Sequence, residues 1–354
     1  MNKVTQLFHT RDELLLGHYT SLENPGLFKG KFGLCLYFFE AFQQCEELKY
    51  QHAAEHLLQE GYNFIHQNPM PTSFDNGLAG IAWGINQLIK RGYLEGNADE
   101  LLMEIDTILF KVISEKTNEL EFGLKRGILG YLIYILDRVS VQPKNAPEKV
   151  NSEIFTSLAV LLINRIHLMA EENRGNFTEP KEFNLFWDLP NYLYVLGEIN
   201  RLNIMPNKTR QMIRNISPLL LSLIPQNLGN CLSLLYGMSK VAHEDWSAHT
   251  RLLQEKLNSA SITSFRLANK SLYVENGLSG LILLDKQVGL EIDDWKGLFN
   301  DEKNVQLAMQ HLEKSEYWRA TEKNPENEMG FIYGITGIHY ALLFLKQIKD
   351  PQHE

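Results

Sequence analysis

The sequence has few cysteines. Its 354 residues include only three, Cys35, Cys45 and Cys231. A small, odd number in a long chain with no recognisable signal peptide is not typical of a disulfide-stapled secreted domain. Any functional cysteine in this chain would therefore act through its thiolate, as a nucleophile or as a metal ligand.

Long apolar runs and basic clusters are also missing. The longest apolar stretches, such as Leu219 to Ile224, are far shorter than the roughly 20 residues of a membrane-spanning helix. The net charge is -9 with a pI near 5.7, and no lysine or arginine run offers a surface for phosphate backbones. We therefore expect a cytoplasmic protein with no membrane span and no nucleic-acid partner.

The short motifs of several enzyme classes are absent as well, since HExxH, GxSxG and GxGxxG do not occur. The composition, 44% hydrophobic and 22% charged, is that of a globular protein with a sizeable core. Apolar residues recur every three or four positions in segments such as 98–113, whereas alternating strand patterns are scarce. These features predict an all-α fold.

The sequence does contain a repeated glycine motif in front of apolar runs. The motif glycines are Gly26, Gly30 and Gly33, then Gly77 and Gly80, then Gly123, Gly127 and Gly130, then Gly277 and Gly280, and last Gly330, Gly334 and Gly337. Two degenerate copies hold the spacing around Asp188 and Ser233. The interval of about 50 residues is the length of one helical hairpin, so we predict seven hairpins, each with an inner and an outer helix.

The recurrence of glycine has two physical explanations. Glycine can supply a positive φ in the turn before each inner helix, or it can allow two backbones to approach where a side chain would collide. Because glycine inside a helix costs about 1 kcal/mol relative to alanine, its regular recurrence indicates a steric requirement. We interpret these glycines as structural.

The motif segments resemble a known family. FDNGLAGIAWGINQLIKRGYLEGN, GLKRGILGYLIYIL and MGFIYGITGIHYALLFL are similar to the glycine motifs of lanthionine synthetase C-like proteins, and the resemblance covers roughly residues 22–346. The fold of that family is an α/α toroid, a double ring of seven helical hairpins. The resemblance therefore implies one toroid domain over residues 1–354.

The resemblance also implies a chemistry. In that family a zinc ion at the mouth of the inner ring activates a peptide cysteine thiol for addition to a dehydrated serine or threonine. The family's ligands are a cysteine in the fifth unit and a Cys-His pair in the sixth. This sequence has Cys231 in the fifth unit but Glu275 and Asn276 in place of the pair. Asparagine is a poor zinc ligand, so we expect no family-type zinc site and no bound cofactor, with Cys231 and Glu275 as a remnant of the metal site.

Residues just before the middle position of each unit are expected around the central mouth. They combine carboxylates, cations, amides and aromatic rings, and the candidates are Asp75, Asn76, Lys125, Arg126, Trp187, Asp188, Asn276 and Tyr333. Such a mixture suits an oriented peptide or sugar better than an apolar ligand. The sequence assigns no catalytic residue.

Three functions follow from these observations. The first is a non-catalytic or zinc-deficient member of a ribosomal-peptide modification pathway, which binds a precursor peptide or partner maturation enzymes. The second is an active lanthionine-forming cyclase with an atypical zinc site at Cys231 and Glu275. The third is a glycan hydrolase, because other α/α toroids hydrolyse glycans with two carboxylates, which Asp75, Asp188 and Glu275 would supply here.

Overall fold

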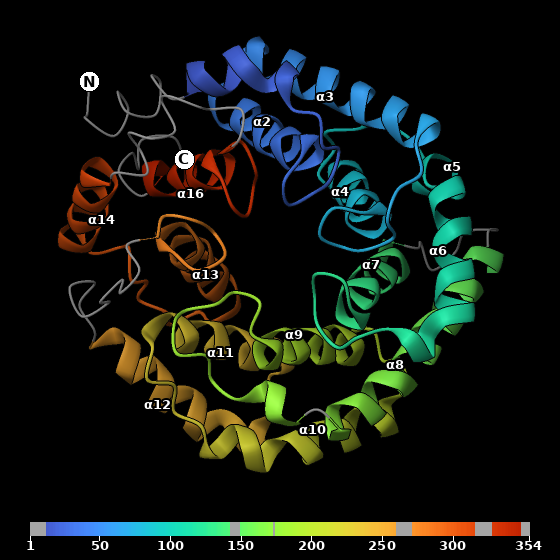
Figure 1. The fold of residues 1–354 in the computed structure, drawn as a ribbon. Helices are drawn as coiled ribbons and strands as arrows, with labels where there is room; N and C mark the ends of the chain where they lie inside the picture. Colours follow the sequence, from blue (N-terminus) through green and yellow to red (C-terminus); the bar gives the residue numbers. More distant parts are fainter. Residues whose placement is uncertain (1–11, 142–148, 173, 260–270, 316–327, 348–354) are drawn as a thin grey trace.

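Two concentric rings of helices form the structure (Figure 1). The structure is a computed structural model that describes residues 12–141, 149–172, 174–259, 271–315 and 328–347. Within these ranges every regular element is a helix, so the predicted all-α class is confirmed.

The inner ring contains seven helices in the described part of the chain. They are α2 (Lys31–Cys45), α4 (Leu78–Lys90), α7 (Ile128–Val141), α9 (Asp188–Arg201), α11 (Leu228–Val241), α13 (Leu278–Glu291) and α16 (Ile335–Gln347). Each helix packs on the next around the ring, and α16 packs on α2, which closes it (Figure 1). The predicted α/α toroid of seven hairpins is thus confirmed.

The outer ring covers the apolar backs of the inner helices. It consists of the helical residues 12–18 and of α3 (Leu48–Gln67), α5 (Ala98–Leu101), α6 (Met103–Lys116), α8 (Lys149–Glu172), α10 (Pro206–Ser222), α12 (Ser247–Asn258) and α14 (Glu302–Lys314). Short 3-10 turns occupy Tyr19–Ser21, Thr117–Glu119, Arg174–Phe177 and Glu244–Trp246. The amphipathic pattern is visible in α6, where Leu109 and Ile113 are buried and Ile108 is exposed.

The glycines allow close backbone approach at the start of the inner helices. A Cβ atom on Gly80 would lie 1.8 Å from the carbonyl oxygen of Phe74, and the third glycines of the other four glycine-rich copies meet a carbonyl in the same way. Gly77, which caps α4, has an extended φ of -119°. Only the first position of the third unit, Gly123, has a positive φ among the motif glycines, at 128°. Steric exclusion is therefore the main reason for the motif.

The fifth unit departs from the predicted register. Helix α11 begins at Leu228, and Asn227 caps it by accepting hydrogen bonds from the backbone of Gly229 and Asn230. Ser233, expected at the helix start, lies inside the helix, so the register predicted for this unit was wrong by six residues. Ser233 was predicted from the repeat spacing alone, because the fifth unit has no glycine loop between its helices.

A segment of the fourth unit covers the start of α11. The side chain of Asn230 donates to the carbonyl oxygen of Pro180 at 2.9 Å and accepts from the backbone of Asn184 at 3.2 Å. Phe183, in the same segment, is buried against Gly229. The beginning of the fifth inner helix is therefore closed off from the mouth of the ring.

A buried polar network closes the ring where its first and last helices meet. Asp12 accepts hydrogen bonds from the hydroxyls of Tyr37 and Tyr50, and lies 3.0 Å from Nδ1 of His339 in α16. Burial by itself would raise the pKa of Asp12, but His339 and the two hydroxyls outweigh it and lower that pKa. The carboxylate thus ties the N-terminal helix to α2, α3 and α16.

One described segment, Glu153–Glu172 of α8, is long and apolar enough by composition to cross a membrane. Its apolar residues include Leu162, Ile163 and Ile166, which are fully buried in the core. The helix packs on α7, so much of its apolar composition serves the contact between the two rings.

Candidate functional site

The loops in front of the inner helices are joined to one another around the mouth of the ring. Backbone hydrogen bonds connect the first, second and third units, and likewise the sixth, the seventh and the first; they join Phe28 to Asp75, Asp75 to Lys125, Glu275 to Ile332, and Ile332 to Phe28. The fourth unit bonds directly to the sixth, since Leu185 donates to the carbonyl oxygen of Glu275 at 2.7 Å. The mouth is therefore built from six loops, and the fifth unit is bypassed.

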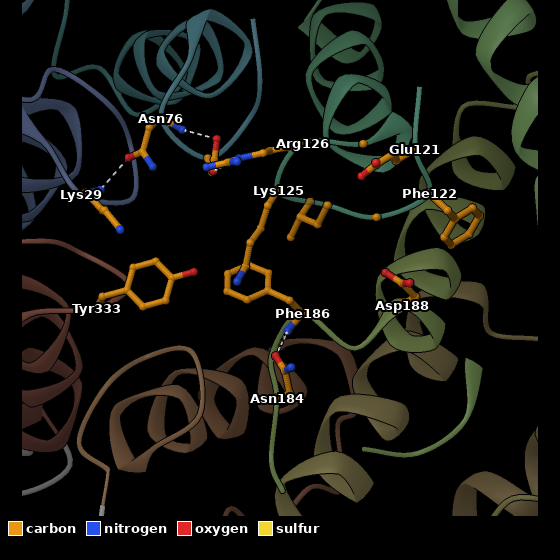
Figure 2. A pocket seen from close by; sticks show the side chains of 14 residues that line it. Lys29, Asn76, Glu121, Phe122, Lys125, Arg126, Asn184, Phe186, Asp188 and Tyr333 are labelled. Carbon is orange, nitrogen blue, oxygen red and sulfur yellow. Dashed lines mark hydrogen bonds and ion pairs between the residues drawn. The ribbon is translucent and has the colours of Figure 1, made fainter. Parts of the chain in front are cut away.

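A cavity of about 540 Å³ opens at this mouth (Figure 2). It is lined by the loops of units one to four and by one residue of unit seven. The lining residues are Lys29, Asp75, Asn76, Glu121, Phe122, Gly123, Leu124, Lys125, Arg126, Gly127, Asn184, Phe186, Asp188 and Tyr333. Six of the eight residues that the sequence places at the mouth are among them.

The other two mouth candidates lie outside the cavity lining. Trp187 is buried, and its indole nitrogen donates to the carbonyl oxygen of Phe177 at 3.2 Å. The side chain of Asn276 accepts a hydrogen bond from Ser271 within its own loop. Both side chains hold their loops in place, and the neighbouring Phe186 takes the position at the cavity that was predicted for Trp187.

An ion pair spans the mouth. Nζ of Lys125 lies 2.6 Å from Oε1 of Glu275, and it stands 4.2 Å and 5.3 Å from the ring centres of Phe186 and Tyr333 (Figure 2 shows these two rings beside Lys125). Burial would lower the pKa of Lys125, but hydrogen bonds to Glu275 and Tyr333 raise it. Lys125 is thus a fixed ammonium group at the centre of the mouth.

A second ion pair holds Arg126 at the edge of the cavity. Nε of Arg126 donates to Oδ2 of Asp75 at 3.0 Å, while Oδ1 of Asp75 accepts from the hydroxyl of Ser73 and the backbone of Asn76. The Asp75 side chain is 8% exposed and the Arg126 side chain 78% exposed. Asp75 therefore orients a guanidinium group that remains open to a ligand.

Two carboxylates, Glu121 and Asp188, line the opposite side of the cavity (Figure 2). Among the described residues, neither carboxylate has a hydrogen-bond donor or a cation in contact. Burial raises the pKa of Asp188 to about 6. Asp188 can therefore bind a cation or exchange a proton near neutral pH.

Sequence reasoning missed Glu121, Phe122, Leu124 and Asn184 as lining residues. Each lies three to six residues before the residue that precedes an inner helix, Gly127 or Trp187, whereas the sequence prediction was limited to the two positions before the middle of each motif. The sequence signal nearest to three of them is Gly123, the first glycine of the third motif, which has a φ of 128° and itself lines the cavity.

The residues present do not fit the zinc site that the resemblance implies. Cys231 is fully buried within α11, and burial raises the pKa of its thiol to about 12. Glu275 is already paired with Lys125. In the described part of the chain no three His, Cys, Asp or Glu side chains lie close enough to hold a metal ion. A structural thiol and an ion-paired carboxylate do not make a zinc centre.

Comparison with known proteins agrees with this architecture. Residues 21–189 match the family described as "Lanthionine synthetase C-like protein". Among solved structures, the chain is similar to nisin cyclase, with a TM-score of 0.65, 16% sequence identity and 98% of each chain covered. No curated protein matches the chain by sequence.

The resemblance found in the glycine motifs is thus confirmed. Residues 21–189 of the chain are similar in sequence to lanthionine synthetase C-like proteins, and the chain shares the toroid fold of nisin cyclase over nearly its whole length.

Proposed function

We propose that this protein takes part in a lanthipeptide-type modification pathway and binds a peptide in the mouth cavity without forming lanthionine on zinc. Support for the pathway comes from the family match and from the fold shared with a protein named for cyclising nisin. The observation that carries the proposal is the Lys125–Glu275 pair, which engages the one candidate metal ligand that lies at the mouth.

The cavity suits a peptide because it offers both signs of charge, amide groups and aromatic faces. A peptide backbone can hydrogen-bond to Asn76 and Asn184, and side chains can pack on Phe186 and Tyr333. A cavity of about 540 Å³ admits a few residues of an extended chain. The partner would be a precursor peptide, alone or presented by other maturation enzymes in the cytoplasm.

Peptide binding is tested with the precursor peptide encoded in the same locus, by fluorescence anisotropy. We expect saturable binding that weakens about tenfold in Phe186→Ala, because a stacked aromatic anchor is lost. Tyr62→Ala is the matched control, since it removes a half-exposed aromatic side chain from outer helix α3. Absence of binding to the wild-type protein would end the proposal.

Metal content separates this proposal from an active zinc cyclase. Protein purified without chelators is analysed for zinc, together with Cys231→Ala. We expect well under one equivalent in both proteins, because Cys231 is a buried thiol with a raised pKa. One equivalent of zinc that disappears in Cys231→Ala would instead establish a cyclase with an atypical site.

A glycan hydrolase remains a second candidate because of one observation. The pKa of Asp188, raised to about 6, lies where a general acid for glycoside hydrolysis needs it, and Glu121 and Asp75 line the same cavity. Hydrolysis of a panel of chromogenic glycosides, abolished by Asp188→Asn, would support this function. No turnover by the wild-type protein would count against it.

A further inference from the structure

Three donor side chains at equivalent positions of consecutive units line one edge of the cavity. Lys29, Asn76 and Arg126 each stand two residues before the first residue of an inner helix, namely α2, α4 and α7. Because the loops of these units are bonded to one another, the repeat places the three side chains along one arc of the mouth. Figure 2 shows all three at the same edge of the cavity, opposite Glu121 and Asp188.

The positive charge of Lys29 has no carboxylate partner in the described part of the chain. Its ammonium group stands 5.2 Å from the ring centre of Tyr333. This differs from Lys125, which is paired with Glu275. Arg126 uses Nε for Asp75, and among the described residues its two terminal amino groups have no hydrogen-bond partner.

The amide of Asn76 is oriented by the same arc. Its Oδ1 accepts from the backbone nitrogen of Lys29 at 2.9 Å, which directs its Nδ2 donor into the cavity (Figure 2). The inner helices α2, α4 and α7 all begin at this edge, and helix N-termini add partial positive charge. With the Asp75 carboxylate paired to Arg126 counted, Lys29 still leaves this edge with a net positive charge, on a protein whose net charge is -9.

We propose that the arc of Lys29, Asn76 and Arg126 is a subsite for a carboxylate of the bound peptide. A carboxylate accepts several hydrogen bonds at once and pairs with guanidinium and ammonium groups. It comes either from an aspartate or glutamate side chain or from the C-terminus of the peptide. This inference rests on the peptide-binding function proposed above, and it adds which chemical group the cavity recognises.

The test uses three pools of fluorescein-labelled random heptapeptides with the wild-type protein. One pool carries a fixed central aspartate and an amidated C-terminus, the second a fixed asparagine and an amidated C-terminus, and the third a fixed asparagine and a free C-terminal carboxylate. The random positions exclude aspartate and glutamate. We expect the first or the third pool to bind about tenfold more tightly than the second, and which of the two does so identifies the source of the carboxylate.

Lys29→Gln is the informative variant, because Lys29 is exposed and its replacement leaves the core unchanged. It should reduce the preference to about threefold or less, with the affinity for the second pool unchanged. Lys111→Gln, which removes an exposed lysine from outer helix α6, should keep the full preference. High salt should weaken the preference in the wild-type protein.

The outcomes separate the two proposals. Equal affinity of the wild-type protein for all pools overturns the carboxylate subsite while peptide binding stands. A preference that survives Lys29→Gln in full also overturns it. Failure of every pool to bind overturns peptide binding, and the subsite with it.

Discussion

Asp188 carries an energetic cost that its replacement should reveal. The carboxylate lines the cavity, has no described partner, and has a pKa raised by burial from 3.8 to about 6. Buried ionisable groups that lower the free energy of unfolding are typical of functional sites. We predict that Asp188→Asn makes the protein more stable near neutral pH and impairs ligand binding.

The magnitude follows from the pKa. The difference between 3.8 and about 6 corresponds to about 3 kcal/mol, since one pKa unit is worth about 1.4 kcal/mol. The carboxylate is partly solvated and sits at the N-terminus of α9, where negative charge is favoured. Both effects reduce the cost, so we expect a gain of about 1 kcal/mol in the free energy of unfolding at about pH 8.

The raised pKa of Asp188 also determines how the stability difference between the two proteins changes with pH. Between about pH 4 and 6 the folded protein binds more protons at Asp188 than the unfolded chain does, so its stability falls as pH rises through this window. The advantage of Asp188→Asn should therefore be full above about pH 6 and vanish below about pH 4. Asp106 also has a pKa of about 6, but it is present in both proteins and cancels in the difference.

Urea unfolding of both proteins across this pH range measures the difference. Asp293→Asn, which changes an exposed aspartate, should show no such pH-dependent gain. Either of two results would refute this prediction: Asp188→Asn is less stable than the wild-type protein at about pH 8, or its gain in stability is the same at all pH values. In both cases burial of the ionised Asp188 carboxylate would not destabilise the fold.

Two further predictions concern the ring itself. Gly80→Ala should destabilise the fold by about 3 kcal/mol or more, because its Cβ would lie 1.8 Å from a carbonyl oxygen, whereas Gly17→Ala, in open helical surroundings, should stabilise it by about 0.5–1 kcal/mol. Urea unfolding of both variants checks this, and equal effects would contradict the close-approach explanation. Asp12→Asn should cost about 2–4 kcal/mol by disrupting the buried network with His339, measured in the same way, and an unchanged midpoint would show that the network does not close the ring.

The fold was predictable because its signal is repeated. Each glycine is weak evidence, but the carbonyl that excludes a Cβ at Gly80 has a counterpart at Gly33, Gly130, Gly280 and Gly337. The same steric contact therefore recurs in the sequence at the same spacing. A steric contact that recurs in this way can be recognised from a single sequence, without an alignment.

The site was predictable only where the motif holds. Lys125, Arg126 and Asp75 stand directly before motif glycines or one residue earlier, and the structure places them at the cavity. The fifth unit lacks the glycine loop. The start of its inner helix was therefore predicted from the repeat spacing alone, without regard to which residue could cap the helix. The capping residue Asn227, whose side chain satisfies two backbone donors, was the local signal that spacing overlooked.

The missing fifth loop explains why the mouth is asymmetric. Without it, the fourth unit reaches across α11 and bonds directly to the sixth at Glu275. This contact holds the Glu275 loop at the mouth, where its carboxylate meets Lys125 from the third unit. The same crossing segment closes off α11, so that Cys231 is left in the core, and the open cavity is confined to the side formed by units one to four. The segment that crosses α11 thus accounts both for the burial of Cys231 and for the position of the cavity.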